Sequence, residues 1–581
     1  MKTLLLGNEA CARGLFEAGC SFVSSYPGTP STEITEAAAT YKEIYAEWAP
    51  NEKVAMEAAF GASLSGLRSA CTMKHVGLNV AADPLFTISY TGVNAGMVIY
   101  VADDPSMHSS QNEQDSRHYA IAAKLPMLEP SDAGESLGFT KLAYEISEKY
   151  DTAVLVKMCT RVAHSQSIVN TAERMEPARK PYEKNIAKYV MMPGMAKKRH
   201  PLVEQRTALL TEYAETAEIN RIDEGTDHSK GFITSSTSYM YVKEVFGDRY
   251  PVLKLGMINP LPEKKIKDFA GSVSEVIVVE ELDGVIEEKC LCLGLSVKGK
   301  EIFGRIGEFS QNILREKLGE PLPEGTAFPE EVPARPPVMC AGCPHRGIYY
   351  VMKKLGLTVF GDIGCYTLGA VAPLAAIDTT ICMGASVSGL HGFNKADAFW
   401  KETHGEGSDR KTVCVIGDST FMHSGMTGLA NIAYNESDST VVILDNSITG
   451  MTGHQQNPTT GFNLKGEACT KIDLESLCRA MGIERVRVVD PYDLLACEEA
   501  LREETSVAAP SVIISRRPCA LLKYVKHPGP ISVDPQKCIG CRSCMKIGCP
   551  AISVKEKKAV IDSTLCTGCR VCSQLCRFGA I

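Results

Sequence analysis

The chain has 581 residues, 44% hydrophobic and 22% charged, which are the values of ordinary globular protein, and this length predicts about four domains. The net charge of −8 argues against nucleic acid as a partner. The N-terminal apolar stretch is too short for a signal peptide, and the longest charge-free stretch, Pro84–Ala102, suits a buried strand and helix better than a membrane span. The 23 cysteines therefore indicate a cytoplasmic protein that ligates metal rather than one that forms disulfides.

Residues 1–165 alternate strands and helices, and we expect them to form the first domain, which ends with a strand at Val154–Cys159. Three of its segments carry candidate functional residues. SYPGTPS, which contains Thr29, is a proline-stiffened turn with Ser31 as a candidate helix N-cap. NEKVAMEAAFGASLSG predicts a helix that places Glu57 among small apolar residues, although a helical glutamate is usually a solvated one. In the polar stretch DDPSMHSSQNEQDSRHY, the guanidinium of Arg117 matches a carboxylate, although a surface arginine is an equally good interpretation.

The middle of the chain predicts two linkers around a second α/β domain. Residues 166–228 mix basic and acidic side chains, which indicates a linker with a helix. Residues 229–325 form the second α/β domain, with strands expected at Gly231–Thr234, Val252–Leu255 and Val276–Glu280. The segment PEEVPARPP is a further linker at the start of a third domain, residues 326–526, and residues 527–581 form a fourth.

Polar residues follow two apolar strands in the third domain. The run Val413–Ile416 leads into Gly417, Asp418 and Ser419, a helix-like stretch follows, and the run Val441–Leu444 leads into Asp445 and Asn446. In a parallel sheet, ligands bind beyond the carboxyl ends of the strands. Asp418 and Asn446 would therefore lie close together and offer oxygen ligands to a Mg²⁺ that holds a diphosphate. Each turn is common alone, and it is the pairing that is specific.

Other residues of the third domain are ambiguous on their own. The Gly-rich turn at Gly384 could approach a phosphate. Cys340 and Cys343 open the domain, Cys365 follows a Gly-Asp-Ile-Gly turn, and Cys519 is the only suitable late cysteine. On spacing alone, these four cysteines are consistent with free thiols at a cofactor site or with zinc ligands.

The last 50 residues contain the strongest chemical signal, eight cysteines in two runs. Their spacing is nearly the doubled C-x2-C-x2-C-x3-C pattern of a bacterial two-cluster ferredoxin, in which the fourth cysteine of each run ligates the cluster of the other run. Four residues instead of three precede the last cysteine of the first run, and no proline follows the second run. The spacing does not suit zinc, whose sites pair two C-x2-C elements over a longer gap. We assign one [4Fe–4S] cluster to Cys538, Cys541, Cys544 and Cys576, and the other to Cys566, Cys569, Cys572 and Cys549.

Taken together, these motifs resemble the 2-oxoacid:ferredoxin oxidoreductase family. The GDS and DN elements resemble the thiamine diphosphate motif, and GMTG with the following Gln455–Thr460 resembles the GMTGGQ-x-SPTT segment of that family. CPHRG and MHSSQNEQDSR look like the alpha subunits of the indolepyruvate enzymes within it. The resemblance covers nearly the whole chain. It implies a pyrimidine-binding domain, a transketolase C-terminal-like domain, a diphosphate domain and a ferredoxin domain, and so an α/β fold with an α+β tail.

The resemblance also implies roles for individual residues. Asp418, Asn446 and the carbonyl of Ile448 would hold the metal. Glu57, preferred over Glu52, would contact the aminopyrimidine of thiamine diphosphate, and Thr29 would hold the carboxylate of the 2-oxoacid. Arg117 is a second candidate for that carboxylate. A third [4Fe–4S] cluster would use Cys340, Cys343, Cys365 and Cys519.

The implied reaction is oxidative decarboxylation of an aryl 2-oxoacid with coenzyme A, assisted by a smaller beta subunit and by external ferredoxin as electron acceptor. Pyruvate or a branched-chain acid remains an alternative substrate. Two other classes of function suit the sequence less well. A non-oxidative thiamine decarboxylase has no use for eight cluster cysteines, and a pure electron carrier has no use for Glu57, Asp418 and Asn446.

Overall fold

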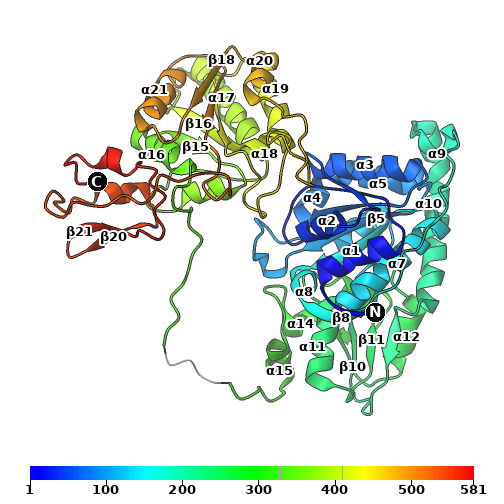
Figure 1. The fold of residues 1–581 in the computed structure, drawn as a ribbon. Coiled ribbons are helices and arrows are strands. Elements are labelled where there is room, and N and C mark those ends of the chain that lie inside the picture. Colours follow the sequence, from blue (N-terminus) through cyan, green and yellow to red (C-terminus); the bar gives the residue numbers. More distant parts are fainter. Residues whose placement is uncertain (326–329, 409) are drawn as a thin grey trace. The chain divides into compact units, whose positions relative to one another are not determined.

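A computed structural model describes residues 1–325, 330–408 and 410–581, so residues 326–329 at the start of the predicted third domain lie outside the described residues. The chain forms two compact units, unit 1 (Met1–Phe328) and unit 2 (Pro329–Ile581), shown in Figure 1. Parallel sheets covered by helices dominate both units, which confirms the predicted α/β class. None of the helices in the described part of the chain has the length and apolar character that a membrane crossing needs.

Unit 1 is built on a seven-stranded sheet with the order β12-β6-β7-β5-β4-β2-β3, parallel except for β12. Its strands are β2 (Phe22–Ser25), β3 (Tyr45–Trp48), β4 (Ser69–Lys74), β5 (Met97–Asp103), β6 (Met127–Leu128), β7 (Val154–Cys159) and β12 (Met257–Asn259). Helices accompany them: α1 (Gly7–Glu17), α2 (Thr32–Ala38), α3 (Glu52–Leu64), α4 (His75–Val80), α5 (Ala82–Thr91), α6 (Arg117–Ala123), α7 (Ala133–Tyr150) and α8 (Thr160–His164). The strands β4, β5 and β7 are buried along their whole length, as expected of parallel strands with both faces covered.

A second sheet in unit 1 has the order β14-β13-β10-β11-β9, parallel except for β9. It contains β9 (Arg221–Asp223), β10 (Gly231–Thr234), β11 (Val252–Lys254), β13 (Val276–Val279) and β14 (Val297–Lys298), with helices α11 (Ser236–Phe246), α12 (Glu263–Gly271), α13 (Val285–Cys292), α14 (Lys300–Phe303) and α15 (Gln311–Leu318). One apolar core includes Met56 of α3 and Leu155 of β7 in the first sheet, together with Ile233 of β10 and Val278 of β13 in the second. The two α/β domains therefore fold against each other.

The segment predicted as a linker with a helix, residues 166–228, contains more structure than expected. It includes α9 (Ile186–Tyr189) and the long helix α10 (Pro193–Thr216), and also β8 (Gln166–Asn170), which pairs with β1 (Lys2–Leu6), and the edge strand β9. Because β8 is mostly exposed, its sequence lacks the apolar run that marks a buried strand.

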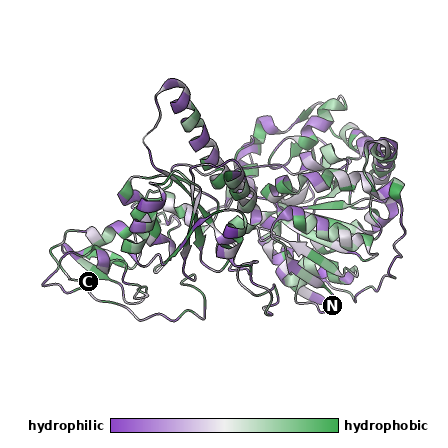
Figure 2. Cartoon of the chain, turned by 90° about the horizontal axis from the view of Figure 1, so that it is seen from above, coloured by the Kyte–Doolittle hydropathy of each residue, from purple (hydrophilic) through white to green (hydrophobic). Residues whose placement is uncertain are grey.

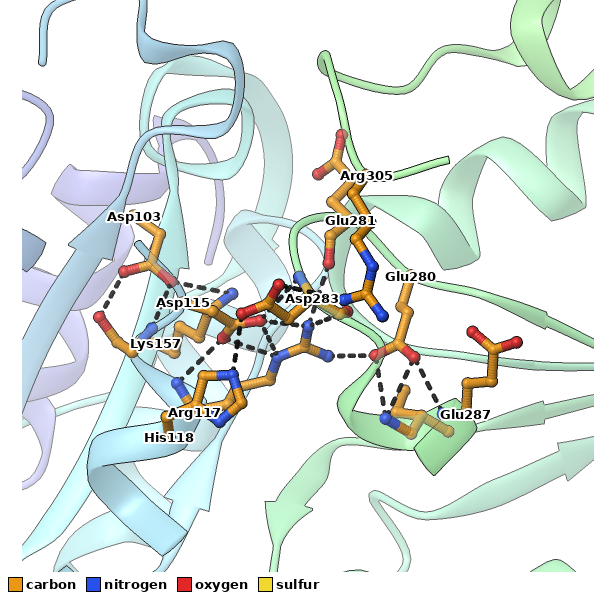
Figure 3. A network of polar contacts seen from close by, with 12 residues as sticks. Asp103, Asp115, Arg117, His118, Lys157, Glu280, Glu281, Asp283, Glu287 and Arg305 are labelled. Carbon is orange, nitrogen blue, oxygen red and sulfur yellow. Dashed lines mark hydrogen bonds and ion pairs between the residues drawn. The ribbon is translucent and has the colours of Figure 1, made fainter. Parts of the chain in front are cut away.

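Arg117 lies in a buried network of charges that joins the two domains of unit 1 (Figure 3). Its guanidinium donates to the carboxylates of Asp115 and Glu280 at 2.5 Å and to the carbonyls of Glu281 and Asp283 at 3.0 and 2.9 Å. Burial raises the pKa of Asp115, but the charge of Arg117 outweighs this and holds it below its usual value. The surface interpretation of Arg117 is therefore wrong, and its carboxylate partners belong to the protein itself.

Unit 2 contains a five-stranded parallel sheet with the order β15-β16-β17-β19-β18. Its strands are β15 (Thr358–Phe360), β16 (Thr412–Gly417), β17 (Thr440–Asp445), β18 (Arg485–Val489) and β19 (Ser511–Arg516), and its helices are α16 (His345–Leu355), α17 (Ala385–His404), α18 (Asp418–Thr420), α19 (Met426–Tyr434), α20 (Leu474–Ala480) and α21 (Leu494–Glu504). Val413 and Val415 face one apolar core, whereas Cys414 and Ile416 face another. In Figure 2 the helices accordingly carry both hydrophobic and hydrophilic residues along their length.

The cysteine-rich tail packs onto the body of unit 2. It contains a hairpin of β20 (Ile552–Lys555) and β21 (Lys558–Ile561). Ile547 and Ile552 of the tail share a core with Ile348 and Tyr349 of α16 and with Leu501 of α21. The tail is therefore held by apolar burial against the sheet domain rather than by its linker alone.

The charge network predicts a large stability effect in unit 1. Replacing Arg117 with Met leaves the side chains of Asp115 and Glu280, 1% and 2% exposed, without their cation. Breaking a buried ion pair in this way costs about 3–5 kcal/mol, which urea unfolding of the full chain measures as a lower unfolding free energy. Arg305, which is 53% exposed and pairs with Asp283, is the matched control, and its change to Met should have little effect. Equal losses in the two variants would contradict this account.

Candidate cofactor and metal site

Asp418 and Asn446 lie side by side, as the sequence predicts. The strands β16 and β17 pair in parallel with Gly417 opposite Leu444, so the residues that follow them meet at one edge of the sheet. One terminal atom of the Asn446 amide lies 2.8 Å from the carbonyl oxygen of Ile448 and 3.2 Å from Oδ1 of Asp418. All three residues are buried, with exposed fractions of 2%, 8% and 3% for Asp418, Asn446 and Ile448.

These separations are those expected around Mg²⁺. Ligand oxygens at about 2.1 Å in octahedral geometry lie about 2.9 Å from their neighbours. Ser447 adopts the left-handed conformation, φ 57°, in the turn between Asn446 and Ile448. The carbonyl of Ile448 and the carboxylate of Asp418 are both hydrogen-bond acceptors, so they repel the amide oxygen of Asn446. Only the amide nitrogen of Asn446 could donate to them in the absence of a cation. The oxygen set therefore fits a hard divalent cation.

The electrostatics of Asp418 point the same way. Burial, and after it the carboxylate of Asp445, raise the pKa of Asp418 to about 7. Asp418 Oδ1 accepts from the amide of Ser419 at 2.8 Å and Oδ2 from the hydroxyl of Thr459 at 3.3 Å. Asp445 itself is paired with Arg516 at 2.8 Å. Among the described residues of unit 2, the buried carboxylate of Asp418 forms no ion pair with a cationic side chain, and a metal ion would stabilise its charged form.

Two glycines and one serine are also predicted to bind the cofactor, and both glycines occupy tight positions. A Cβ on Gly417 would lie 2.6 Å from the ring of Tyr366, and a Cβ on Gly384 would lie 2.6 Å from Cβ of Ser424. Gly384 caps α17 with φ 86°, and its amide donates to the buried Asp362 at 3.0 Å. The backbone amide of Gly384 is therefore already hydrogen-bonded to a carboxylate of the protein. Ser419 accepts a hydrogen bond from Thr449 at 2.9 Å.

The cysteines at the two ends of the third domain come together next to the oxygen ligands. Burial raises the pKa of Cys343 to about 12, and Cys340 and Cys519 add to that shift. Burial, Cys519 and Cys340 likewise raise the pKa of Cys365 to about 11. The amide of Cys519 donates to the carbonyl of Asn446 at 2.9 Å. Four thiols that act on one another electrostatically, beside a candidate metal site, can hold a cluster near the cofactor.

The tail brings its eight cysteines together in the two crossed sets that the sequence predicts. One cavity is lined by Cys538, Cys541, Cys544 and Cys576. The pKa of Cys572 is raised to about 12 by burial first and then by the other set, Cys569, Cys549 and Cys566. Backbone amides of Ala559 and Ala580 point at the sulfurs of Cys538 and Cys576 at 3.4 and 3.3 Å. Such N–H···S contacts are one means by which proteins tune cluster potentials.

Arg346 joins the Cys340 turn to the tail. Its guanidinium donates to the carbonyl of Cys340 at 3.1 Å and to that of Ile547 at 3.1 Å. A Cβ on Gly342 would lie 2.3 Å from Oγ1 of Thr567, so the backbone between Cys340 and Cys343 touches the residue after Cys566. The sequence gives no periodic or spacing signal for this contact, which joins segments about two hundred residues apart.

In unit 1, the structure separates the two candidate glutamates. Glu57 is 47% exposed on α3 and pairs with Lys53, so it is not buried with the small apolar residues that flank it in the sequence. Glu52, the first residue of the same helix, is only 4% exposed, and a Cβ on Gly77 of α4 would lie 2.5 Å from its Oε1. Glu52 shares the buried face of α3 with Ala55, Met56, Ala59 and Ser63, a spacing that the sequence does contain.

Thr29 is half-buried in the turn after β2. Ser31 stands at the N-cap position of α2, but its hydroxyl donates to the carbonyl of Gly28 at 2.8 Å instead of capping the helix. The amide of Gly28 donates in turn to the hydroxyl of Thr32 at 3.0 Å. These bonds hold the Thr29 turn at the carboxyl end of β2, the edge of the sheet where ligands bind in α/β folds.

Comparisons with known proteins show which families the domains of this chain match. Residues 13–228 match the family model for pyruvate flavodoxin/ferredoxin oxidoreductase, thiamine diphosphate-binding domain. Residues 362–515 match the C-terminal TPP-binding domain of thiamine pyrophosphate enzymes, and residues 530–577 match a 4Fe-4S dicluster domain. The chain is therefore a thiamine-dependent iron–sulfur oxidoreductase of the 2-oxoacid:ferredoxin type.

Full-length relatives define the family more narrowly. The chain is 39% identical to the indolepyruvate oxidoreductase subunit IorA of Archaeoglobus fulgidus, over 100% of this chain and 97% of that protein. It is 40% identical to the IorA subunit of Thermococcus kodakarensis, over 100% and 96% of the two chains. The IorA subunit of Methanothermobacter thermautotrophicus is 39% identical, over 100% and 97%. The chain belongs to the IorA family of indolepyruvate oxidoreductase subunits, which confirms the family predicted from its motifs.

The oxygen cluster predicts the effect of removing one ligand. Changing Asp418 to Ala should abolish retention of Mg²⁺ and thiamine diphosphate, because a divalent cation there loses its one charged ligand. Bound thiamine after gel filtration and iron content are the two measurements, and the iron should stay at the wild-type value. Asp473→Ala, which removes an exposed N-cap aspartate of α20, is a control for general damage. Normal thiamine retention in the Asp418 variant would exclude this residue as a ligand.

Proposed function

We propose that the chain catalyses the thiamine diphosphate-dependent oxidative decarboxylation of an aryl 2-oxoacid, indolepyruvate, to its acyl-CoA. In this reaction the 2-oxoacid anion and coenzyme A give the acyl thioester, CO₂, one proton and two electrons, and the electrons pass to ferredoxin. The observation that carries the proposal is the convergence of the Asp418, Asn446 and Ile448 oxygens beside four thiols in unit 2. The names of the relatives support indolepyruvate as the substrate, and the word subunit in those names supports a partner chain, which we propose is a smaller beta subunit.

In this proposal, unit 2 holds the diphosphate end of the cofactor through Mg²⁺ on Asp418, Asn446 and the Ile448 carbonyl. When bound, thiamine diphosphate would supply a nucleophilic carbon and would take up the electron pair of the C–C bond that breaks as CO₂ leaves. Cys340, Cys343, Cys365 and Cys519 would hold a third [4Fe–4S] cluster. The Arg346 contacts with the Cys340 turn and with Ile547 support short transfers from that cluster to the two clusters of the tail.

Unit 1 would supply the carboxylate that binds the aminopyrimidine. Glu52 is favoured over Glu57 for this role, since a buried acid can share a proton with a ring nitrogen whereas an exposed one is paired and hydrated. Its place at the start of α3, packed against α4, fixes the carboxylate in position.

Two other functions fit less well. A non-oxidative decarboxylase would leave the crossed cysteine sets without a purpose, and an electron carrier would leave the oxygen cluster without one. The substrate is tested with the purified complex of this chain and its beta subunit, under anaerobic conditions. A low-potential dye should be reduced only with coenzyme A present, and fastest with indolepyruvate in a panel with pyruvate, 2-oxoglutarate and a branched-chain 2-oxoacid. A preference for another acid would correct the substrate, and CO₂ release without dye reduction would contradict the oxidative reaction.

The same substitution, glutamate to glutamine, should have different effects at Glu52 and at Glu57. Glu52→Gln should keep the iron and bound thiamine but slow exchange of the cofactor C2 proton by about 100-fold or more, because the hydrogen bond from a carboxyl to the pyrimidine is lost. Glu57→Gln, on the exposed face of the same helix, is the matched control and should exchange normally. Proton NMR of the cofactor after quenching measures both. The reverse result would restore Glu57 as the activating residue.

A further inference from the structure

Lys74 at the end of β4 is a buried cation that has no carboxylate partner among the described residues. The described residues contain three buried lysines, Lys74, Lys157 and Lys254. Lys157 pairs with Glu129 at 2.6 Å and with Asp103 at 3.5 Å, and Lys254 pairs with Glu135. For Lys74, which is 7% exposed, no carboxylate of the described residues lies within 4 Å of Nζ.

The hydrogen bonds of Lys74 do not satisfy its ammonium group. Nζ donates to the carbonyl of Ser109 at 2.7 Å and, at a long 3.4 Å, to the hydroxyl of the same residue. An ammonium group has three donors, so at least one is left without a partner in the described structure. Burial lowers the pKa of Lys74 to about 8, against the raising effect of Asp104. An unpaired charge of this kind is costly in a folded protein unless a ligand pairs it.

Asp104, the acid whose charge acts on Lys74, already accepts hydrogen bonds from other residues. Its carboxylate accepts from the hydroxyl of Ser110 at 2.6 Å, from the amide of Ser109 at 2.8 Å and from the hydroxyl of Thr160 at 2.8 Å. Asp104 therefore holds the loop after β5 in place, and the loop in turn presents one carbonyl to Lys74. The cation remains available to an anion from outside the chain.

Lys74 lies where an α/β sheet binds ligands. It is the last residue of β4, which pairs with β2 on one side and β5 on the other. A Cβ on Gly28 would lie 3.1 Å from Cβ of Lys74, so the turn that carries Thr29 touches this lysine. The next residue, His75, is fully buried, and its Nδ1 has no partner in the described structure. A cation, a hydroxyl-bearing turn and an unsatisfied polar atom thus gather at one edge of the sheet.

We propose that the ammonium group of Lys74 binds the carboxylate of the 2-oxoacid substrate, with the Thr29 turn beside it. The inference rests on the proposed function, which supplies a 2-oxoacid. Arg117, the cation expected from the sequence to take this role, donates to two carboxylates and two carbonyls of the protein. The diphosphate of the cofactor has its own candidate ligands in unit 2, at Asp418 and Asn446. A substrate carboxylate is therefore the anion that suits Lys74.

The test compares Lys74→Met with Lys74→Arg in the complex with the beta subunit. Losing a charge-assisted hydrogen bond should raise KM for the 2-oxoacid about 10- to 100-fold in Lys74→Met, with a smaller change in kcat and none in KM for coenzyme A. Lys74→Arg, which keeps the charge, should recover part of the loss. Lys149→Met removes an exposed lysine on α7 and is the matched control, with unchanged KM.

A second measurement isolates the carboxylate. The wild-type complex should bind phenylpyruvate as a competing ligand far better than its neutral methyl ester, and Lys74→Met should lose about that same factor of preference. The inference would be overturned if Lys74→Met kept the wild-type preference for the carboxylate, or if its KM rose for coenzyme A and not for the 2-oxoacid. In either case the variant would still bind thiamine and reduce the dye. Failure of the proposed function would instead appear in the wild type, as absence of 2-oxoacid-dependent dye reduction.

Discussion

The crowding of oxygen atoms at the carboxyl ends of β16 and β17 is the constraint on which the chemistry of this chain depends. Asp418 and the Ile448 carbonyl face one end of the Asn446 amide at 3.2 and 2.8 Å. Parallel pairing of two buried strands brings these groups together, and the left-handed turn at Ser447 lies between two of them. A buried set of acceptors repels itself, and a divalent cation removes that repulsion. The amide of Cys519 bonds to the backbone of the same asparagine, so the candidate cluster ligands depend on the same turn.

Buried charge in unit 1 divides into two kinds. Arg117 and Lys157 have carboxylate partners within the protein, and removing any one of those charges would strand another. They belong to the network that holds two α/β domains together. Lys74 has only neutral partners among the described residues, and it lies at the ligand-binding edge of the sheet. Whether a buried charge is already paired thus separates residues that maintain the fold from those available to a ligand.

The sequence predicted the parts of the structure that depend on local spacing. Strand ends located Asp418 and Asn446, and the doubled cysteine pattern predicted the crossed sets that line the tail. It failed where the answer depends on distant partners. Arg117 is bonded to Glu280, which is 163 residues away. The sequence did not point to Lys74, because the environment of this lysine comes from the loop at Ser109.

The exposure of Glu57 was missed for a different reason. The helical face formed by Glu52, Ala55, Met56 and Ala59 is visible in the sequence, and counting it would have placed Glu57 on the opposite side. Glu57 was preferred because its neighbours along the chain are apolar, but burial in a helix depends on which residues share its face. In the same way, the exposed strand β8 was missed inside a predicted linker because only buried strands carry an apolar run.

Iron content combined with 2-oxoacid-driven cluster reduction tests the central claim, that unit 2 carries electrons from the thiamine site to the tail through Cys340, Cys343, Cys365 and Cys519. The reconstituted wild-type chain should hold about twelve iron atoms, at four per cubane cluster. Cys343→Ser should lose about four of them, and its tail clusters should be reduced by dithionite but no longer by indolepyruvate. A wild-type chain with only about eight iron atoms, or a Cys343→Ser variant whose tail clusters the 2-oxoacid still reduces at the normal rate, would contradict the account.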